Sequence, residues 1–293
     1  MQEETSLTEL RAQIDAVDDA MHDLLMKRAA LVEQVGRAKA ARDDSGAKGV
    51  LRPKREIEIM RRLWNRHKGA LDREVVMRVW REIISACVNL QSPLTLAAFM
   101  PERGSGLAET ARGYFGAFTP VMPCCSVNLV LKELTQGEAD VALLPLYADI
   151  ALLSLHDDKQ ACWWYAVAQE YKRSVGVFLK LPFEGSGAGL RDGGTAYALA
   201  KMPYERTGDD KTLLVAETDG TISLSTLDLI LKSGGIATNT ICDTYNPDMM
   251  RKAYLFEVDG WLSDRDERLG ALVEKENGKI TTLRVIGGYP AKL

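Results

Sequence analysis

Hydrophobic side chains recur at helical spacing along the first forty residues. Ser6-Leu7-Thr8-Glu9 has the form of a capping box, which marks the start of a helix. From there apolar residues return every three or four positions to about Ala41, and no proline interrupts them. Such a helix spans roughly 50 Å, too long for a monomeric domain of about 90 residues to cover. We therefore expect a partner helix from a second copy.

Two further helices are predicted before residue 92. Asp43 to Gly46 breaks the first pattern, and Pro53 suits the first turn of a second helix that ends near His67. Asp72 is placed to cap a third helix, whose apolar residues again fall on one face. Residues 1–92 are therefore predicted to form an all-α, three-helix domain.

The composition changes near Ser92-Pro93. Only one of the ten prolines and four of the twenty-four glycines precede that point, so we place a domain boundary there. Residues 93–209 then read as an α/β region with a glycine-rich loop at 185–194. Its predicted elements are strands at 94–100, 141–146 and 171–181, and helices at 107–115 and 128–135.

The pattern after residue 210 predicts a third domain, over 210–293. Strands are expected at 213–217, 238–244, 253–258 and 281–286, and helices at 223–233 and 264–275. Gly234-Gly235 stops the first of these helices. The resulting order, βαββαβ, is that of a ferredoxin-like sandwich.

Bulk properties narrow the class of protein. The net charge of −4 argues against a nucleic-acid partner. No run approaches eighteen apolar residues, so no membrane span is expected, and the acidic start Met1 to Glu4 is no signal peptide. The five cysteines are irregularly spaced and suggest neither a disulfide framework nor a metal site. These features fit a cytoplasmic protein.

Four cations on the first two helices are candidates for ligand binding: Arg11, Arg28, Lys39 and Arg55. Arg28 and Lys39 are three helical turns apart and share a face. Arg11 lies roughly 25 Å before Arg28, so only an antiparallel copy could bring both to one small ligand. Converging cations suit a compact dicarboxylate. The alternative is that they are solvated charges on long helices.

The residues around these cations identify a family. Residues 6–92 resemble the helical class of chorismate mutase, the mutase half of bacterial P-proteins, which implies an intertwined homodimer. The matching stretches are Leu10-Arg11, Ile14 to Asp18, Leu24 to Arg28, Val35 to Lys39, Arg55-Glu56 and Gln91.

The resemblance implies that Arg11 of the partner subunit, together with Arg28 and Arg55, binds the two carboxylates of chorismate. Two positions depart from the family. Arg52 stands where the family often has an acid, and Cys87 stands where it has a serine. These changes affect a hydroxyl contact and a carboxylate contact, so we expect reduced activity at worst.

The resemblance also implies how the reaction is catalysed. Lys39 and Gln91 would donate hydrogen bonds to the ether oxygen of the breaking C–O bond, and Glu56 would accept one from the ring hydroxyl. The rearrangement to prephenate is pericyclic and needs no nucleophile, so the site must hold the folded conformer and stabilise charge on that oxygen. No cofactor and no metal are implied.

The rest of the chain resembles a prephenate dehydratase followed by an ACT regulatory domain. The ACT likeness rests on residues 210–213, on the turn Gly220-Thr221-Ile222 where the family binds its effector, and on the ending 284–290. The family's Glu-Ser-Arg-Pro motif would fall near Cys242 to Tyr245 and is absent. The turn leaves room for an aromatic amino acid effector. Because the second motif is absent, we expect weak or no phenylalanine binding at this turn.

The dehydratase motifs are degenerate. The Pro-Ile-Glu-Asn-Ser motif is Pro145 to Asp149 here, and the catalytic Thr-Arg-Phe motif is Thr195-Ala196-Tyr197, in which only the threonine survives. The stretch between them is too short for a full second lobe. We therefore expect a reduced, inactive lobe, unless Arg173 replaces the missing arginine.

We predict a chorismate mutase of aromatic amino acid biosynthesis. Three alternatives remain open: a bifunctional mutase and dehydratase that makes phenylpyruvate, a pyruvate lyase that acts on isochorismate, and a non-catalytic ligand sensor.

Overall fold

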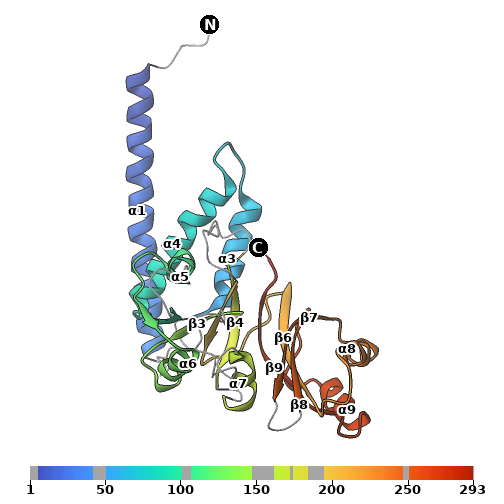
Figure 1. Ribbon diagram of the computed structural model, residues 1–293. Coiled ribbons are helices and arrows are strands. Elements are labelled where there is room, and N and C mark those ends of the chain that lie inside the picture. The colour runs from blue at the N-terminus through green and yellow to red at the C-terminus, as the bar shows by residue number, and fades with distance from the viewer. Residues whose placement is uncertain are drawn as a thin grey trace. The chain divides into compact units, whose positions relative to one another are not determined.

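The computed structural model describes residues 6–41, 51–100, 107–146, 162–171, 174–183, 195–246 and 251–292. The chain divides into two compact units (Figure 1). The first comprises residues 1–51 and 86–93, and the second comprises residues 52–85 and 94–293. None of the helices in the described part of the chain is long and apolar enough to cross a bilayer. The domain limits at 92 and 209 remain predictions.

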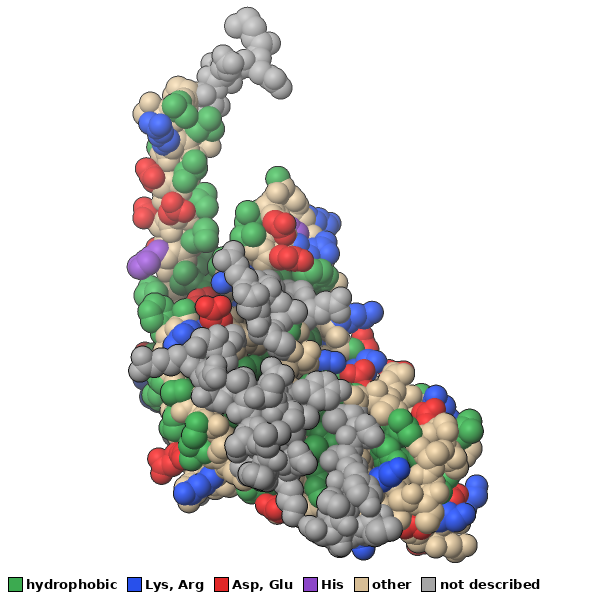
Figure 2. Space-filling view, viewed as in Figure 1, with side chains coloured by type: hydrophobic (Ala, Val, Ile, Leu, Met, Phe, Trp, Pro, Cys, Tyr) green, Lys and Arg blue, Asp and Glu red, His purple; other side chains and the backbone are tan. Residues whose placement is uncertain are grey.

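The first unit is dominated by α1, Leu7–Ala40, an unbroken helix of 34 residues. Its predicted start is confirmed, because Ser6 Oγ accepts from the Glu9 N–H at 3.3 Å while Ser6 N donates to Glu9 Oε2 at 2.8 Å. Figure 2 shows hydrophobic side chains along one edge of this helix and charged side chains along the other.

The apolar edge of α1 is open to solvent in the single chain. The exposed fractions of its apolar side chains run from 45% at Leu10 to 65% at Leu24. Eight apolar side chains within that range follow the helical repeat: Leu7, Leu10, Ile14, Val17, Met21, Leu24, Leu31 and Val35. We call this set the α1 stripe.

The two other predicted helices are also confirmed. The helix α3 is Pro53–Arg66, with Pro53 in its first turn, and α4 is Arg73–Gln91. Asp72 caps α4, because its Oδ1 accepts from the Glu74 N–H at 2.8 Å. The helix α3 buries Ile57 and Met60.

The second unit contains a mixed nine-stranded sheet in the order β2-β1-β3-β5-β4-β9-β6-β8-β7. Its first strands β1, β2 and β3 are parallel, with Leu96 opposite both Val121 and Val141. The strands β4 and β5 extend the sheet in antiparallel pairings. The bounds are β1 Leu96–Phe99, α5 Leu107–Phe115, β2 Val121–Cys124, α6 Val127–Gln136, β3 Val141–Pro145, α7 Trp163–Gln169, β4 Gly176–Leu181 and β5 Ala196–Ala200.

The sequence failed to predict β2, α7 and β5, and it placed the start of β4 at Tyr171 rather than Gly176. The strand β2 has four residues, including Pro123, and α7 has seven, so neither is long enough to show a period. The strand β5 is Ala-Tyr-Ala-Leu-Ala, which lacks β-branched residues. The predicted loop at 185–194 lies outside the described residues.

The last six elements follow the predicted βαββαβ order. They form an antiparallel sheet with α8 and α9 on one side (Figure 1), around a core that includes Leu227, Phe256 and Leu272. The helix α9 begins three residues later than predicted, after its cap Asp266. The bounds are β6 Asp210–Thr218, α8 Leu224–Ser233, β7 Thr238–Asn246, β8 Arg251–Asp259, α9 Glu267–Lys275 and β9 Ile280–Pro290.

The two halves of the sheet join where β9 meets β4. The register pairs Val177 with Gly287. Gly287 has a φ of 131°, and a Cβ at this position would overlap the Val177 backbone. Glycine is therefore required for β4 and β9 to approach each other.

Candidate active site on the helices

Two side-chain hydrogen bonds join α1 to the end of α4 within the first unit. Lys39 Nζ donates to Gln91 Oε1 at 3.1 Å, and Arg28 Nη1 donates to Cys87 Sγ at 2.5 Å. The Gln91 amide also donates from Nε2 to the Cys87 carbonyl oxygen at 3.2 Å, which turns Oε1 toward the lysine. All four side chains are half-buried. The structure thus brings together four of the predicted site residues.

The local sequence explains why these side chains meet. Cys87 and Gln91 are one turn apart on α4, so they lie on the same face. Gly36, on α1, faces Gln91, and a Cβ there would sit 3.5 Å from Gln91 Cγ. A small residue at this position lets the end of α4 approach α1 closely. Lys39 and Arg28 then extend from either side of Gly36.

Arg11 lies apart from this group on α1. It precedes Arg28 by seventeen positions, which is about 25 Å of helix, and it is exposed. Its predicted role requires the partner subunit and remains a prediction.

Within the second unit, Arg52 immediately precedes α3, and Arg55 and Glu56 lie in its first turn. Arg55 is 68% exposed and pairs with Glu58 at 3.3 Å. Arg52 Nη1 lies 4.0 Å from a carboxylate oxygen of Glu205. Glu56, by contrast, is buried.

Glu56 forms a buried ion pair with Arg81 of α4. Arg81 Nη2 donates to Glu56 Oε2 at 2.6 Å, and the two side chains are only 4% and 10% exposed, respectively. The guanidinium carbon also lies 4.2 Å from the ring centroid of Tyr114. Burial alone would lower the pKa of Arg81, but the charge and hydrogen bond of Glu56, together with Tyr114 and Glu82, outweigh it and raise that pKa. Arg81 is therefore held charged beneath α3.

Sequence reasoning missed Arg81, although a signal was present. Arg81 falls at helical spacing between Met77, Ile84 and Val88, which are all buried. A cation within an apolar face needs a buried partner, because an unpaired charge there is costly. Within the described residues, Arg81 Nε and Nη1 have no hydrogen-bond partner.

The predicted effector turn follows β6. Gly220 has a φ of 80°, as a left-handed turn requires. Thr221 donates to Asp219 Oδ1 from its backbone N–H at 2.9 Å and from its hydroxyl at 2.6 Å. Ile222 is buried in the core. The turn is thus stabilised by its own hydrogen bonds.

The remnants of the two dehydratase motifs are neighbours in the sheet. Pro145 of β3 is opposite Ala196 of β5, and Leu146 N donates to the Thr195 carbonyl oxygen at 3.1 Å. Ala196 and Tyr197 are fully buried. The motif residues 147–149 and Arg173 lie outside the described residues.

The comparisons with known proteins begin with the helical part of the chain. Residues 10–92 match the family model for chorismate mutase type II. The bifunctional chorismate mutase/prephenate dehydratase of Stutzerimonas stutzeri is 32% identical over 147 residues, which cover 50% of this chain and 40% of the relative. The enzyme of the same name from Neisseria gonorrhoeae is 32% identical over 136 residues, 46% of this chain and 36% of the relative. The chain therefore spans about two fifths of the length of these relatives.

Two solved structures show a more distant likeness. A quorum-quenching acylase has a TM-score of 0.46 at 15% identity and covers 68% of this chain and 95% of its own. A prephenate dehydratase from Arthrobacter aurescens, in complex with L-Phe, has a TM-score of 0.45 at 14% identity and covers 67% of this chain and 90% of its own.

Proposed function

Since residues 10–92 match the family model for chorismate mutase type II, we propose that this chain converts chorismate to prephenate by a Claisen rearrangement in aromatic amino acid biosynthesis. The observation that carries the proposal is the meeting of Lys39 and Gln91, from two different helices, at 3.1 Å. Such a pair is suited to receive one ligand atom between them.

Lys39 supplies the main electrostatic contribution. As the C–O bond breaks, negative charge develops on the ether oxygen, and a preorganised cationic donor stabilises that charge more than it stabilises the ground state. Gln91 holds the ammonium in place and adds a neutral donor. A charged donor forms a hydrogen bond about twice as strong as a neutral one, so Lys39 outweighs Gln91.

The arginines bind the carboxylates and hold the reactive conformer. Arg28 has five N–H donors, and the bond to Cys87 uses one of them and orients the guanidinium. Arg55 is exposed on the first turn of α3 and provides a second fork. Arg11 of the partner subunit provides the third.

Glu56 accepts the ring hydroxyl of the substrate. A carboxylate offers about four lone-pair sites, and the hydrogen bond from Arg81 engages Oε2 of Glu56. We assign Arg81 the role of a positioning residue, which fixes the Glu56 carboxylate so that Oε1 can receive the hydroxyl.

The α1 stripe supports a homodimer. Eight exposed apolar side chains along one helix form a surface that a soluble monomer rarely shows. A second α1 packed against it would bury the stripe and carry Arg11 to the other subunit's site. We expect this enzyme in the cytoplasm.

The assay that tests the proposal supplies chorismate to the purified full chain and measures prephenate, phenylpyruvate and salicylate. Prephenate formation that depends on Lys39 supports the mutase. Salicylate from isochorismate would instead indicate the lyase, and the absence of all three products would indicate a non-catalytic sensor.

We propose that residues 93–209 are a dehydratase-like region without dehydratase activity. Ala196 stands where the family has its arginine, and Tyr197 is buried between the rings of Trp163 and Tyr289, at 5.7 and 5.9 Å. This strand therefore contributes to the core, and it presents no cation to a carboxylate.

The names of the curated relatives favour the second candidate, a bifunctional mutase and dehydratase. The two candidates differ in what happens to prephenate. Supplying prephenate at neutral pH and following phenylpyruvate by its absorbance in alkali separates them. Formation in proportion to enzyme, above the spontaneous rate, would support the bifunctional enzyme.

We further propose that residues 210–293 are an ACT-like regulatory domain, because their βαββαβ order and the turn at Gly220 to Ile222 fit that class. The bonds that Thr221 makes to Asp219 agree with weak or absent phenylalanine binding at this turn. Calorimetry with phenylalanine tests this, and micromolar affinity lost in Thr221→Ala would refute it.

A further inference from the structure

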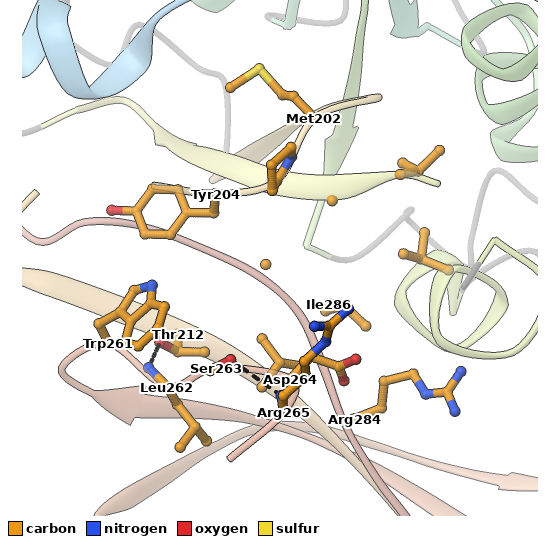
Figure 3. Close-up of a pocket in the computed structure, with 16 residues that line it drawn as sticks. Met202, Tyr204, Thr212, Trp261, Leu262, Ser263, Asp264, Arg265, Arg284 and Ile286 are labelled. Atoms are coloured by element: carbon orange, nitrogen blue, oxygen red, sulfur yellow. Dashed lines mark hydrogen bonds between the residues drawn. The ribbon is translucent and has the colours of Figure 1, made fainter. Parts of the chain in front are cut away.

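A cavity of about 340 Å³ lies in the second unit, at the junction between the α/β strands and the βαββαβ segment. This volume is within the range of small-molecule sites. Figure 3 shows Met202 and Tyr204 on one side of the cavity and the loop that carries Trp261, Leu262 and Asp264 on the other. We call it the junction pocket.

The junction pocket is distinct from the effector turn. Its lining includes Thr212, near the start of β6, whereas Gly220 follows the end of that strand. The six steps from Thr212 to Thr218 span roughly 20 Å in a strand. A ligand in the pocket would therefore not touch the turn.

The walls of the pocket are fixed in place by hydrogen bonds. Thr212 Oγ1 accepts from Leu262 N at 3.0 Å and donates to the Gly260 carbonyl oxygen at 2.8 Å. On the opposite wall, the Tyr204 hydroxyl donates to Asp210 Oδ1 at 2.5 Å. A preformed pocket loses little conformational entropy when it binds a ligand.

The apolar part of the lining suits a flat hydrophobic group. Trp261 is 45% exposed, although tryptophan gains more than most side chains from burial. Met202, Tyr204 and Ile286 line the same space. An aromatic ring seated here would cover the indole and offset its exposure.

The charged part of the lining favours an anion. Arg265 and Arg284 line the pocket against one carboxylate, Asp264, so two positive charges less one negative leave a net charge of +1. Arg284 Nη1 is held by the Ala168 carbonyl oxygen at 3.0 Å. The side chain of Arg265 is exposed and extends from the loop toward Ile286 (Figure 3). An arginine fork matches a carboxylate.

We propose that the junction pocket binds a small aromatic carboxylate, with its ring on Trp261 and Tyr204 and its carboxylate on Arg265. Asp264 would accept an ammonium group if the ligand carries one. An α-amino acid and a plain aromatic acid share the carboxylate and the ring, and only the amino acid adds the ammonium group.

Calorimetry on the full chain tests the proposal with three probes: 3-phenylpropanoate, L-phenylalanine and 2-phenylethylamine. At least one of the two carboxylates should bind, and the amine, which lacks the carboxylate, should not. Arg265→Met and Trp261→Ala should each weaken binding at least about tenfold, since each removes one of the two recognition groups. Both side chains are exposed, so these variants should fold.

Arg206→Met is the matched control, because Arg206 is an exposed cation outside the lining. It should leave binding unchanged. Binding of 3-phenylpropanoate alone identifies a plain acid, and binding of L-phenylalanine alone identifies an amino acid held by Asp264. The proposal is overturned if neither carboxylate binds at millimolar concentration, or if binding survives both pocket variants. Because the readout is heat of binding, it is independent of mutase activity.

Discussion

The buried pair of Glu56 and Arg81 gives the sharpest prediction. Arg81→Met removes the cation and keeps a side chain of similar length. Glu56 then remains at 10% exposure without the charge that the structure places 2.6 Å away. Removal of one partner from a buried ion pair costs about 3–5 kcal/mol, because the other charge is left uncompensated.

A double-mutant cycle separates the interaction energy between Glu56 and Arg81 from the other destabilising effects of each substitution. Glu56→Gln alone leaves Arg81 buried without its counter-charge and should also destabilise the protein. Glu56→Gln combined with Arg81→Met removes both charges, so it should lose less than the sum of the two single variants. Arg62→Met is the control, since Arg62 is exposed on α3, and it should change the free energy of unfolding by no more than about 0.5 kcal/mol.

The assay is urea unfolding followed by circular dichroism at the helix band, with all variants measured at one pH. A loss of less than about 1 kcal/mol in Arg81→Met, or a loss equal to that of Arg62→Met, would show that the pair does not stabilise the packing of α3 on α4. Full additivity in the cycle would lead to the same conclusion.

The remaining predictions concern the site and the second unit. Lys39→Ala should lower the turnover of chorismate by about 10²–10³ with an unchanged circular dichroism spectrum, and more than half of the wild-type turnover would contradict the site assignment. Inactive Arg11→Ala mixed with inactive Lys39→Ala should recover some activity after subunit exchange, because a hybrid dimer holds one site without either lesion. Burial would raise the pKa of Asp210, but bonds from Thr207 and Tyr204 outweigh it and lower that pKa. Its contribution to stability is thus present above the unfolded pKa near 3.9 and lost as the pH falls through the folded value. Asp210→Asn should therefore reduce the free energy of unfolding at pH 7 and flatten its dependence on pH in acid. Urea titrations at pH 7 and below the unfolded pKa would reveal both effects. Arg61→Met should lower the thermal midpoint of the second unit, and a midpoint equal to that of wild type would show that the bonds from Arg61 to the carbonyl oxygens of Thr207 and Lys292 do not stabilise it.

The long elements could be predicted from the sequence because each carries its own start signal and period. The helix α1 has a capping box and about eight turns of apolar repeat, and α3 has a proline in its first turn. The missed elements are stabilised by the fold around them. The strand β5, for example, is placed between β3 and β4 by pairings to residues that are far away in the sequence.

Some contacts of the candidate site and its surroundings could likewise be predicted from the sequence, and others could not. The meeting of Lys39 with Gln91 followed from the resemblance, and the structure places them at hydrogen-bond distance. The partners of Arg61 could not be found from residue types. Its guanidinium donates to the backbone carbonyl oxygens of Thr207 at 2.7 Å and Lys292 at 2.9 Å. Every residue has a backbone carbonyl, so residue types do not reveal such partners.

These contacts of Arg61 connect three features of the second unit. Arg61 lies on α3, two turns after the start that bears Arg55 and Glu56. The segment it holds, through Thr207, begins with Met202 to Tyr204, which line the junction pocket. Tyr204 and Thr207 both donate to the same carboxylate, Asp210.

A ligand that shifts Tyr204 must therefore disturb either the bonds to Asp210 or the carbonyl oxygens that hold Arg61. Coupling between sites requires an element whose arrangement both sites influence. The segment from Met202 to Asp210 is the candidate for such an element, since one of its ends forms a wall of the pocket and the other is bonded to α3. If the mutase is regulated through the junction pocket, this short, hydrogen-bonded segment is the physical route, and Arg61 is the residue at which that route reaches the helix of Arg55 and Glu56.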